Sequence, residues 1–259
     1  MNDTNSNLNI TARSHKAESY AEIFGSPGTR VRMAGLLRTQ WPLLIVVALS
    51  GYLVRASWPV PPISSTIAGL LFLVLAVFVA AAANYSKVRL QAFLKGAKGE
   101  EITARELSLL PQGYTVFHGL NICRYPGLAA TGSDLDHVVV GPTGIFAVET
   151  KNWSDSITIE NGELLYDGIT PTRPPLEQVK NEAQSLRAYL KSKTELNLEV
   201  QPVLCFASNN LPQGEQGSSG VLVCNADRLT TVILSNIENH VTDSAQQSII
   251  ETLLKICET

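Results

Sequence analysis

Asp136, Glu149 and Lys151 have the side-chain types and spacing needed for chemistry on a phosphate. They lie in the stretch 134–153, where β-branched and aromatic residues on both sides of a Gly-Pro-Thr-Gly sequence favour two short strands. Residues 141–144 are typical of a tight turn, because proline presets φ at its second position and glycine closes it. The stretch therefore predicts a β-hairpin that carries two acids and a lysine near its open end.

The register of this hairpin decides whether the two acids meet. If the connection holds an even number of residues, Gly141 pairs with Gly144 and Asp136 lies opposite Glu149. Side chains in such a pair are about 5 Å apart at Cβ, where like charges destabilise the sheet. A Mg²⁺ ion would offset this repulsion, since it takes one or two carboxylates plus water. Lys151 falls on the same face by the two-residue period of a strand.

Two alternatives stay open for the hairpin. A three-residue loop with a bulge at Gly144 would shift the register by one residue and separate the acids. The hairpin could also be a plain amphipathic one, whose acids are only solvated. The matched register, the adjacent lysine and the apolar strands favour the functional interpretation.

The order of sequence blocks around the hairpin resembles the PD-(D/E)XK nuclease core and, more fully, its nuclease-related (NERD) domain. The resemblance covers roughly residues 96–235 and rests on five blocks: Lys98-Gly99-Glu100, Leu135-Asp136-His137, Gly141 to Phe146, Val148 to Trp153, and Pro175-Leu176-Glu177-Gln178.

The resemblance implies a role for each matching residue. Asp136 and Glu149 would ligate Mg²⁺ or Mn²⁺, and Lys151 would assist the attacking water. Glu100 would be an acid carried by a helix, and Gln178 a polar residue at the rim of the site. The implied activity is hydrolysis of nucleic-acid phosphodiester bonds.

Hydrophobic residues make up 45% of the chain and charged residues 17%, which is too apolar for an ordinary soluble enzyme of this length. The stretches 39–54 and 56–86 hold no charged residue. A bilayer-spanning helix needs about 20 residues, so we expect two transmembrane helices rather than buried core helices. Basic residues flank both stretches and the Pro-rich connection between them has no charge. The positive-inside rule then places both termini and the C-terminal domain in the cytoplasm of an integral cell-membrane protein.

These patterns predict the following organisation: a disordered or basic juxtamembrane segment at 1–38, two transmembrane helices at 39–85, a linker helix at 86–98, the NERD domain at 99–235 and a C-terminal helix at 236–259. Gly96 and Gly99 are expected to interrupt the linker helix, so that Glu100 opens a new one. Strands alternating with helices indicate an α/β fold with a restriction-endonuclease-like mixed sheet flanked by helices. The segment 208–219 is expected to be a polar loop.

The charge balance argues against the nuclease hypothesis. Residues 86–259 carry fourteen Lys/Arg against twenty Asp/Glu, whereas nucleic-acid binding draws on Lys and Arg contacts to phosphates. The leading hypothesis is a membrane-anchored, Mg²⁺-dependent nuclease acting at the cytosolic face, with DNA as the expected nucleic acid. The alternative is a non-catalytic, nuclease-derived module that binds nucleic acid or protein at the membrane. The four cysteines are scattered and have no zinc-site spacing, so we expect them to be reduced and buried.

Overall fold

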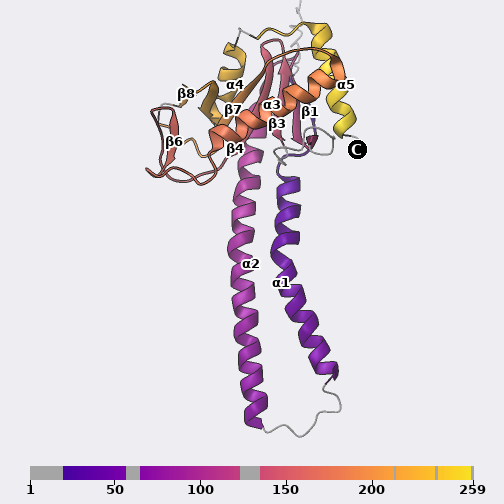
Figure 1. The fold of residues 1–259 in the computed structure, drawn as a ribbon, viewed down its shortest axis with the longest axis vertical. Helices are drawn as coiled ribbons and strands as arrows, with labels where there is room; N and C mark the ends of the chain where they lie inside the picture. Colours follow the sequence, from indigo (N-terminus) through magenta and orange to yellow (C-terminus); the bar gives the residue numbers. More distant parts are fainter. Residues whose placement is uncertain (1–19, 57–64, 123–134, 213, 237–238, 258–259) are drawn as a thin grey trace, which may run out of the picture.

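The computed structural model describes residues 20–56, 65–122, 135–212, 214–236 and 239–257 (Figure 1). Residues 1–19 of the segment expected to be disordered or basic, and the Pro-rich connection between the two uncharged stretches, therefore lie outside the described residues. The described part consists of a long helical hairpin and a globular α/β domain.

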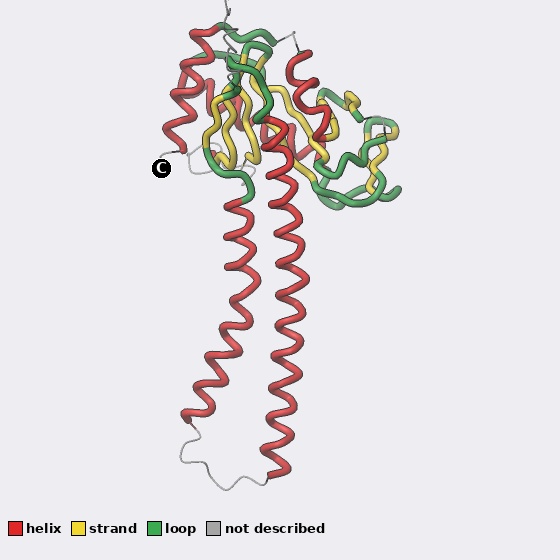
Figure 2. Tube along the Cα trace, turned by 180° about the vertical axis from the view of Figure 1, so that it is seen from behind, coloured by secondary structure: helices red, strands yellow, loops and turns green. Residues whose placement is uncertain are grey.

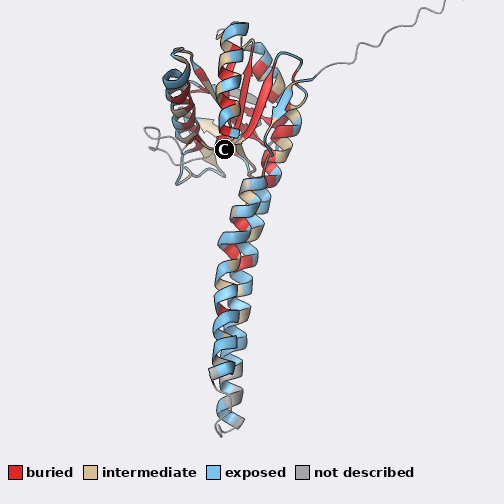
Figure 3. Ribbon diagram, turned by 90° about the vertical axis from the view of Figure 1, so that its right-hand side faces the viewer, coloured by how far each residue is buried: buried red, intermediate tan, exposed pale blue. Residues whose placement is uncertain are grey.

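The hairpin is made of α1 (Thr29–Ala56) and α2 (Ser65–Leu107), which lie side by side and project from one end of the domain (Figures 1 and 2). Their segments Val31–Tyr52 and Leu73–Leu107 are long and apolar enough to cross a membrane, judged by length and composition. Outside the domain, most of the described residues of the two helices are exposed, as Figure 3 shows. Apolar side chains that the protein itself does not cover fit contact with lipid.

The predicted interruption of the second helix is wrong, because α2 runs without a break for 43 residues and ends at Leu107. Glu100 therefore lies within this helix and does not open a new one. A Cβ at Gly99 would lie 2.7 Å from the Cβ of Asn152, so the glycine permits close approach between α2 and the segment after the predicted hairpin. Packing, rather than helix termination, explains this glycine. The expected boundaries at 86 and 99 both fall inside one continuous helix.

A mixed seven-stranded sheet forms the centre of the domain, in the order β1-β2-β3-β4-β7-β9-β8. The pairs β1–β2, β4–β7 and β7–β9 are parallel and the others are antiparallel. Its strands are β1 (Glu22–Phe24), β2 (Thr115–Leu120), β3 (Leu135–Gly141), β4 (Gly144–Lys151), β7 (Val200–Phe206), β8 (Glu215–Ser218) and β9 (Val221–Asn225). A separate hairpin of β5 (Ile157–Glu160) and β6 (Glu163–Tyr166) lies beside the sheet.

Helices cover both faces of the sheet. α3 (Pro175–Thr194) and α5 (Asp243–Cys257) pack on one face, while α2 and α4 (Ala226–Ser235) pack on the other. Each face has its own apolar cluster, and alternate residues of β3 and β4 point into one cluster or the other. The predicted α/β class, with a mixed sheet flanked by helices, is confirmed.

Three elements were not expected from the sequence. β1 precedes the helical hairpin, inside the segment expected to be disordered or basic, and pairs with β2. β8 occupies part of the expected 208–219 loop, and α4 follows β9 directly. Both strands are only three or four residues long, too short to produce a recognisable alternation.

Candidate functional site

The register predicted for the β3–β4 hairpin is confirmed. Gly141 pairs with Gly144 across a two-residue connection, and the pairing continues to His137 opposite Val148. One further residue along this register sets Asp136 opposite Glu149. Val138 and Ala147 on the same face belong to the cluster under α3 and α5. Glu149 points towards α3, because Gln178 of α3 donates to its carboxylate. Strand alternation is expected to place Asp136 on the same face, one residue beyond the last β3–β4 pair.

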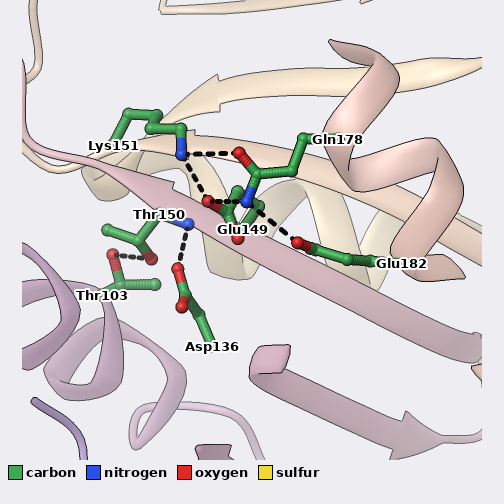
Figure 4. Close-up of polar contacts among 7 residues, drawn as sticks. All are labelled: Thr103, Asp136, Glu149, Thr150, Lys151, Gln178 and Glu182. Atoms are coloured by element: carbon green, nitrogen blue, oxygen red, sulfur yellow. Dashed lines mark hydrogen bonds and ion pairs between the residues drawn. The ribbon is translucent and has the colours of Figure 1, made fainter. Parts of the chain in front are cut away.

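Glu149 is the centre of a polar network that joins β4 to the first turns of α3 (Figure 4). Its Oε1 accepts hydrogen bonds from Lys151 Nζ at 2.5 Å and from Gln178 Nε2 at 2.7 Å. Lys151 Nζ also donates to Gln178 Oε1 at 3.0 Å, and Gln178 Nε2 donates to Glu182 Oε1 at 2.9 Å. Gln178 thus fixes the position of the lysine and of both glutamates.

The second carboxylate oxygen of Glu149, Oε2, has different surroundings. Only 5% of this side chain is exposed, and its Oε2 is buried without a hydrogen-bond partner within the described part of the chain. A buried, unsatisfied carboxylate oxygen is costly, so native sites usually give it a proton, a water or a cation.

Asp136 lies in an acidic environment and interacts electrostatically with Glu149. Burial raises the pKa of Asp136 well above its usual value, and the charges of Glu149, Glu100 and Glu182 raise that pKa further. A hydrogen bond of 2.9 Å from the backbone N–H of Thr150 to Asp136 Oδ2 opposes the rise in pKa. The site therefore holds several carboxylates close together, and a bound cation would reduce the repulsion between them.

Lys151 is the basic group of the network. Burial lowers its pKa, but the nearby Glu149, Asp136 and Glu182 outweigh burial, so its pKa lies above the usual value. The ammonium group is therefore charged at neutral pH. It remains 21% exposed and can be reached from solvent.

The opposite face of β4 is tied to α2. Thr150 Oγ1 donates to Thr103 Oγ1 at 3.1 Å, and Thr103 Oγ1 lies 3.6 Å from Cys205 Sγ of β7. Glu100, one turn earlier on α2, accepts a 2.9 Å hydrogen bond from the backbone N–H of Gly28, just before α1. Glu100 thus links the start of the helical hairpin to the edge of the site.

The donor set fits a hard divalent cation bound by few protein ligands. Among the residues that the structure describes, no group of three or more His, Cys, Asp or Glu side chains is arranged to hold a metal ion. Mg²⁺ binds through one or two carboxylates and keeps several waters, and Asp136 with Glu149 supplies that number. The unpaired Glu149 Oε2 is the oxygen best placed to ligate it.

The structure thus brings together four of the five predicted site residues: Asp136, Glu149, Lys151 and Gln178. Glu100 contributes its charge to the surroundings of Asp136, while its carboxylate bonds to the backbone before α1. Their catalytic and metal-binding roles stay predictions.

Sequence reasoning missed Glu182, which is 2% exposed and bonded to Gln178. A signal for it existed. Glu182 falls on the apolar stripe of α3, three residues after Val179 and four before Leu186, where a charged side chain needs a buried partner. The cysteine prediction holds only in part, because Cys205 and Cys224 are buried but Cys257 is exposed, and Cys123 lies outside the described residues.

Comparison with known proteins finds a family match over the residues that form the site. Residues 95–207 match the family described as nuclease-related domain, or NERD. A stretch of 60 residues is 43% identical to an uncharacterized protein of Bacillus anthracis, and covers 23% of this chain and 27% of that protein. The chain therefore spans about a quarter of the length of that relative. No solved structure matches the chain. The matched residues include Asp136, Glu149, Lys151 and Gln178, so the part of the protein that carries this network is similar to a nuclease-related domain.

Proposed function

We propose that this protein is a membrane-anchored, Mg²⁺- or Mn²⁺-dependent nuclease. It would hydrolyse phosphodiester bonds at the cytosolic face, with DNA as the expected substrate. The observation that carries the proposal is the buried Glu149, whose Oε2 is unpaired, with the partly buried Asp136 interacting with its charge and the charged Lys151 bonded to it. The family match supports a nuclease-related role. The two long apolar helices support the anchor.

Each residue of the network has a defined part in this proposal. Asp136 and Glu149 would hold the cation, which when bound activates water and neutralises charge on the phosphate. Lys151 Nζ would stabilise negative charge that develops on the phosphate oxygens. Gln178 holds Lys151 and Glu149 in place through two hydrogen bonds. It lies in the first turn of α3, the end of a helix that favours an anion.

The full chain, purified in detergent, tests the proposal with labelled single- and double-stranded DNA and RNA in the presence of Mg²⁺ or a chelator. We expect metal-dependent cleavage that Glu149→Gln abolishes. Lys151→Ala should abolish cleavage as well, but the rise in melting temperature with Mg²⁺ should remain, because lysine does not ligate the cation. Cleavage at full rate by Glu149→Gln would place the catalytic residues elsewhere.

The alternative is a non-catalytic module that binds nucleic acid or protein at the membrane. The excess of acidic residues after position 86 favours it, because it limits contacts to phosphates. This alternative predicts no cleavage by the wild type with any substrate, even when Mg²⁺ raises the melting temperature.

A further inference from the structure

The positive charge of this protein is separated from its globular domain. Residues 100–259 carry ten Lys/Arg against twenty Asp/Glu, a formal net charge of −10. The stalk, defined as residues 30–38 of α1 and 87–98 of α2, carries seven Lys/Arg and no acid. A polyanion that reaches the acidic site can therefore follow the positive charge of the stalk.

The lysine of the site lies at the end of β4 that adjoins the stalk. β4 ends at Lys151, and the next residue, Asn152, donates its side-chain N–H to the backbone carbonyl of Lys95 at 2.7 Å. Lys95 Nζ donates to Ser154 Oγ at 3.1 Å. The stalk part of α2 thus contacts the segment that leaves β4 through Lys95. In Figure 1, α2 meets the domain beside β4.

The stalk charges fall into two levels. Ser86 Oγ donates to the carbonyl of Thr39 at 2.6 Å, which places both residues at one height, and the first charges above them are Arg38 and Lys87. A helix rises about 1.5 Å per residue, so Arg38, Lys87 and Arg89 lie within about 5 Å of that height. We take the end of the uncharged stretch at Ser86 as the edge of the hydrocarbon core. The distance of about 5 Å then falls within the headgroup layer, which is about 5–8 Å thick on each side of the core.

Lys95 and Lys98 belong to the upper level. They lie about 13 Å and 18 Å above Ser86 by the same helical rise, beyond the headgroup layer. Both side chains are exposed. Arg32, at a similar height on α1, is instead paired with Glu101.

We infer that Lys95 and Lys98 form a phosphate-contacting surface that leads a single-stranded nucleic acid from the membrane side of the domain to the site. This inference rests on the proposed function for its ligand. The lower charges, Arg38, Lys87 and Arg89, face the lipid headgroups. Lys95 and Lys98 are positioning residues and take no part in the chemical step.

Binding of a labelled single-stranded oligonucleotide to the full chain, in a chelator so that no cleavage occurs, tests the inference. Lys95→Gln/Lys98→Gln should weaken binding and lower the slope of log affinity against log salt by about 1.4, because each phosphate contact on a single strand contributes about 0.7. Lys95→Arg/Lys98→Arg should restore both. Lys191→Gln/Lys193→Gln, which removes two exposed charges from the far end of α3, is the matched control and should leave the slope unchanged.

Lipid is distinguished by repeating the titration in nanodiscs of phosphatidylcholine and of phosphatidylglycerol. The difference between wild type and Lys95→Gln/Lys98→Gln should persist in both, because these lysines lie above the headgroups. Its loss in phosphatidylglycerol alone would show that lipid occupies them and would overturn the inference. So would an affinity and salt slope equal to those of the control variant, or the absence of oligonucleotide binding. Binding through the two lysines without cleavage when Mg²⁺ is added would instead sink the proposed nuclease activity alone.

Discussion

Asp136 lies among three other carboxylates, and its pKa reflects their charges together with its burial. Each of these three carboxylates accepts a hydrogen bond from a different residue: Glu149 from Lys151, Glu182 from Gln178, and Glu100 from Gly28. Asp136 is bonded to a backbone N–H. At the scale of single residues, the site is therefore a cluster of acids that one lysine does not neutralise.

Asp136→Asn should stabilise the metal-free protein at about pH 8 and lose this advantage near pH 4. The native pKa of Asp136 lies above its usual value of 3.8, so the native state binds more protons than the unfolded state between these two pKa values. The free energy of unfolding of the wild type therefore falls as pH rises through that window. Asparagine has no proton to lose and keeps an oxygen for the Thr150 N–H.

Thermal unfolding in a chelator across this pH range measures the difference. Mg²⁺ at about pH 8 should raise the melting temperature of the wild type by mass action, and should not raise that of Asp136→Asn. A difference between the two proteins that does not depend on pH would contradict the raised pKa.

At the scale of elements, α2 is the helix that positions the site. One continuous helix extends from the apolar hairpin to Thr103, which contacts Thr150 of β4. Gly99 and Gly96 lie three residues apart on it and differ in their surroundings. A Cβ at Gly96 would meet Val31 Cγ1 at 3.9 Å, an ordinary contact, whereas a Cβ at Gly99 would overlap Asn152.

Gly99→Ala should destabilise the protein by about 1–3 kcal/mol, because the added methyl forces α2 away from the segment after β4. Gly96→Ala is the matched control. It should be neutral or stabilising by up to about 1 kcal/mol, since alanine favours a helix over glycine and the space is available. Denaturant unfolding in detergent compares the two, and equal effects would mean that Gly99 is not a contact point.

The β2–β3 pair contains a second ionisable contact. His118 and His137 are paired across the two strands, both are buried, and their Nδ1 atoms are 2.7 Å apart, so one of these atoms must donate and the other accept. Burial lowers the pKa of His118 to about 4. Burial, with a smaller contribution from His118, lowers the pKa of His137 well below its usual value.

The histidine pair should make the protein less stable as pH falls from about 6.5 to 4. Both native pKa values lie below 6.5, so the unfolded state binds more protons in this window and stability is lost on acidification. His118→Gln/His137→Gln should flatten this part of the profile. Because Asp136 has the opposite dependence, the comparison is best made in an Asp136→Asn background, where an unchanged slope would argue against the pair.

At the scale of the whole molecule, the domain contacts both the segment that precedes α1 and the C-terminal part of α2. α2 packs against the sheet, and the segment before α1 contributes β1 to the sheet edge and its Gly28 N–H to Glu100. Phe24 of β1 stacks on Phe117 of β2, with ring centroids 5.4 Å apart. The globular domain is therefore assembled from residues on both sides of the hairpin in the sequence.

A soluble fragment 88–259 should be less stable than the same fragment with residues 20–28 attached to its N-terminus by a flexible Gly/Ser linker. The attached segment restores β1 and the Gly28–Glu100 hydrogen bond, both of which the short fragment lacks. Melting temperatures of the two fragments measure the gain. Phe24→Ala in the linked fragment should remove part of it, whereas equal melting temperatures would show that β1 adds nothing.

The charge pattern predicts the orientation in the membrane. Single cysteines introduced at Lys98 and at Pro62, in a chain whose own cysteines are replaced, should differ in intact cells. An impermeant thiol reagent should label the cysteine at 62 and not the one at 98, because the basic stalk stays in the cytoplasm. Labelling at 98 would reverse the proposed topology.

The sequence by itself determined the local features of this protein. The β3–β4 register followed from the turn chemistry around Pro142 and from strand alternation. The apolar residues of α3 recur at three- and four-residue spacing, which is typical of a helix with one buried face. Asn161-Gly162, a dipeptide typical of tight hairpin turns, connects β5 to β6, and both residues have positive φ. Two helices able to span a membrane followed from uncharged length alone. In each case the determining contacts lie within a short stretch of chain.

Only the tertiary structure decided what depends on contacts between distant segments. Gly99 lies inside a helix, and its missing side chain leaves room for Asn152. This is a contact between residues far apart in the sequence. Glu182 joins the site because α3 places it beside Gln178 and Asp136, and Glu100 bonds to Gly28 across the whole hairpin. β1 is too short to be a strand without β2 as its partner. Local propensity is a weak prior where packing supplies the larger free energy, so these features appear only in the folded chain.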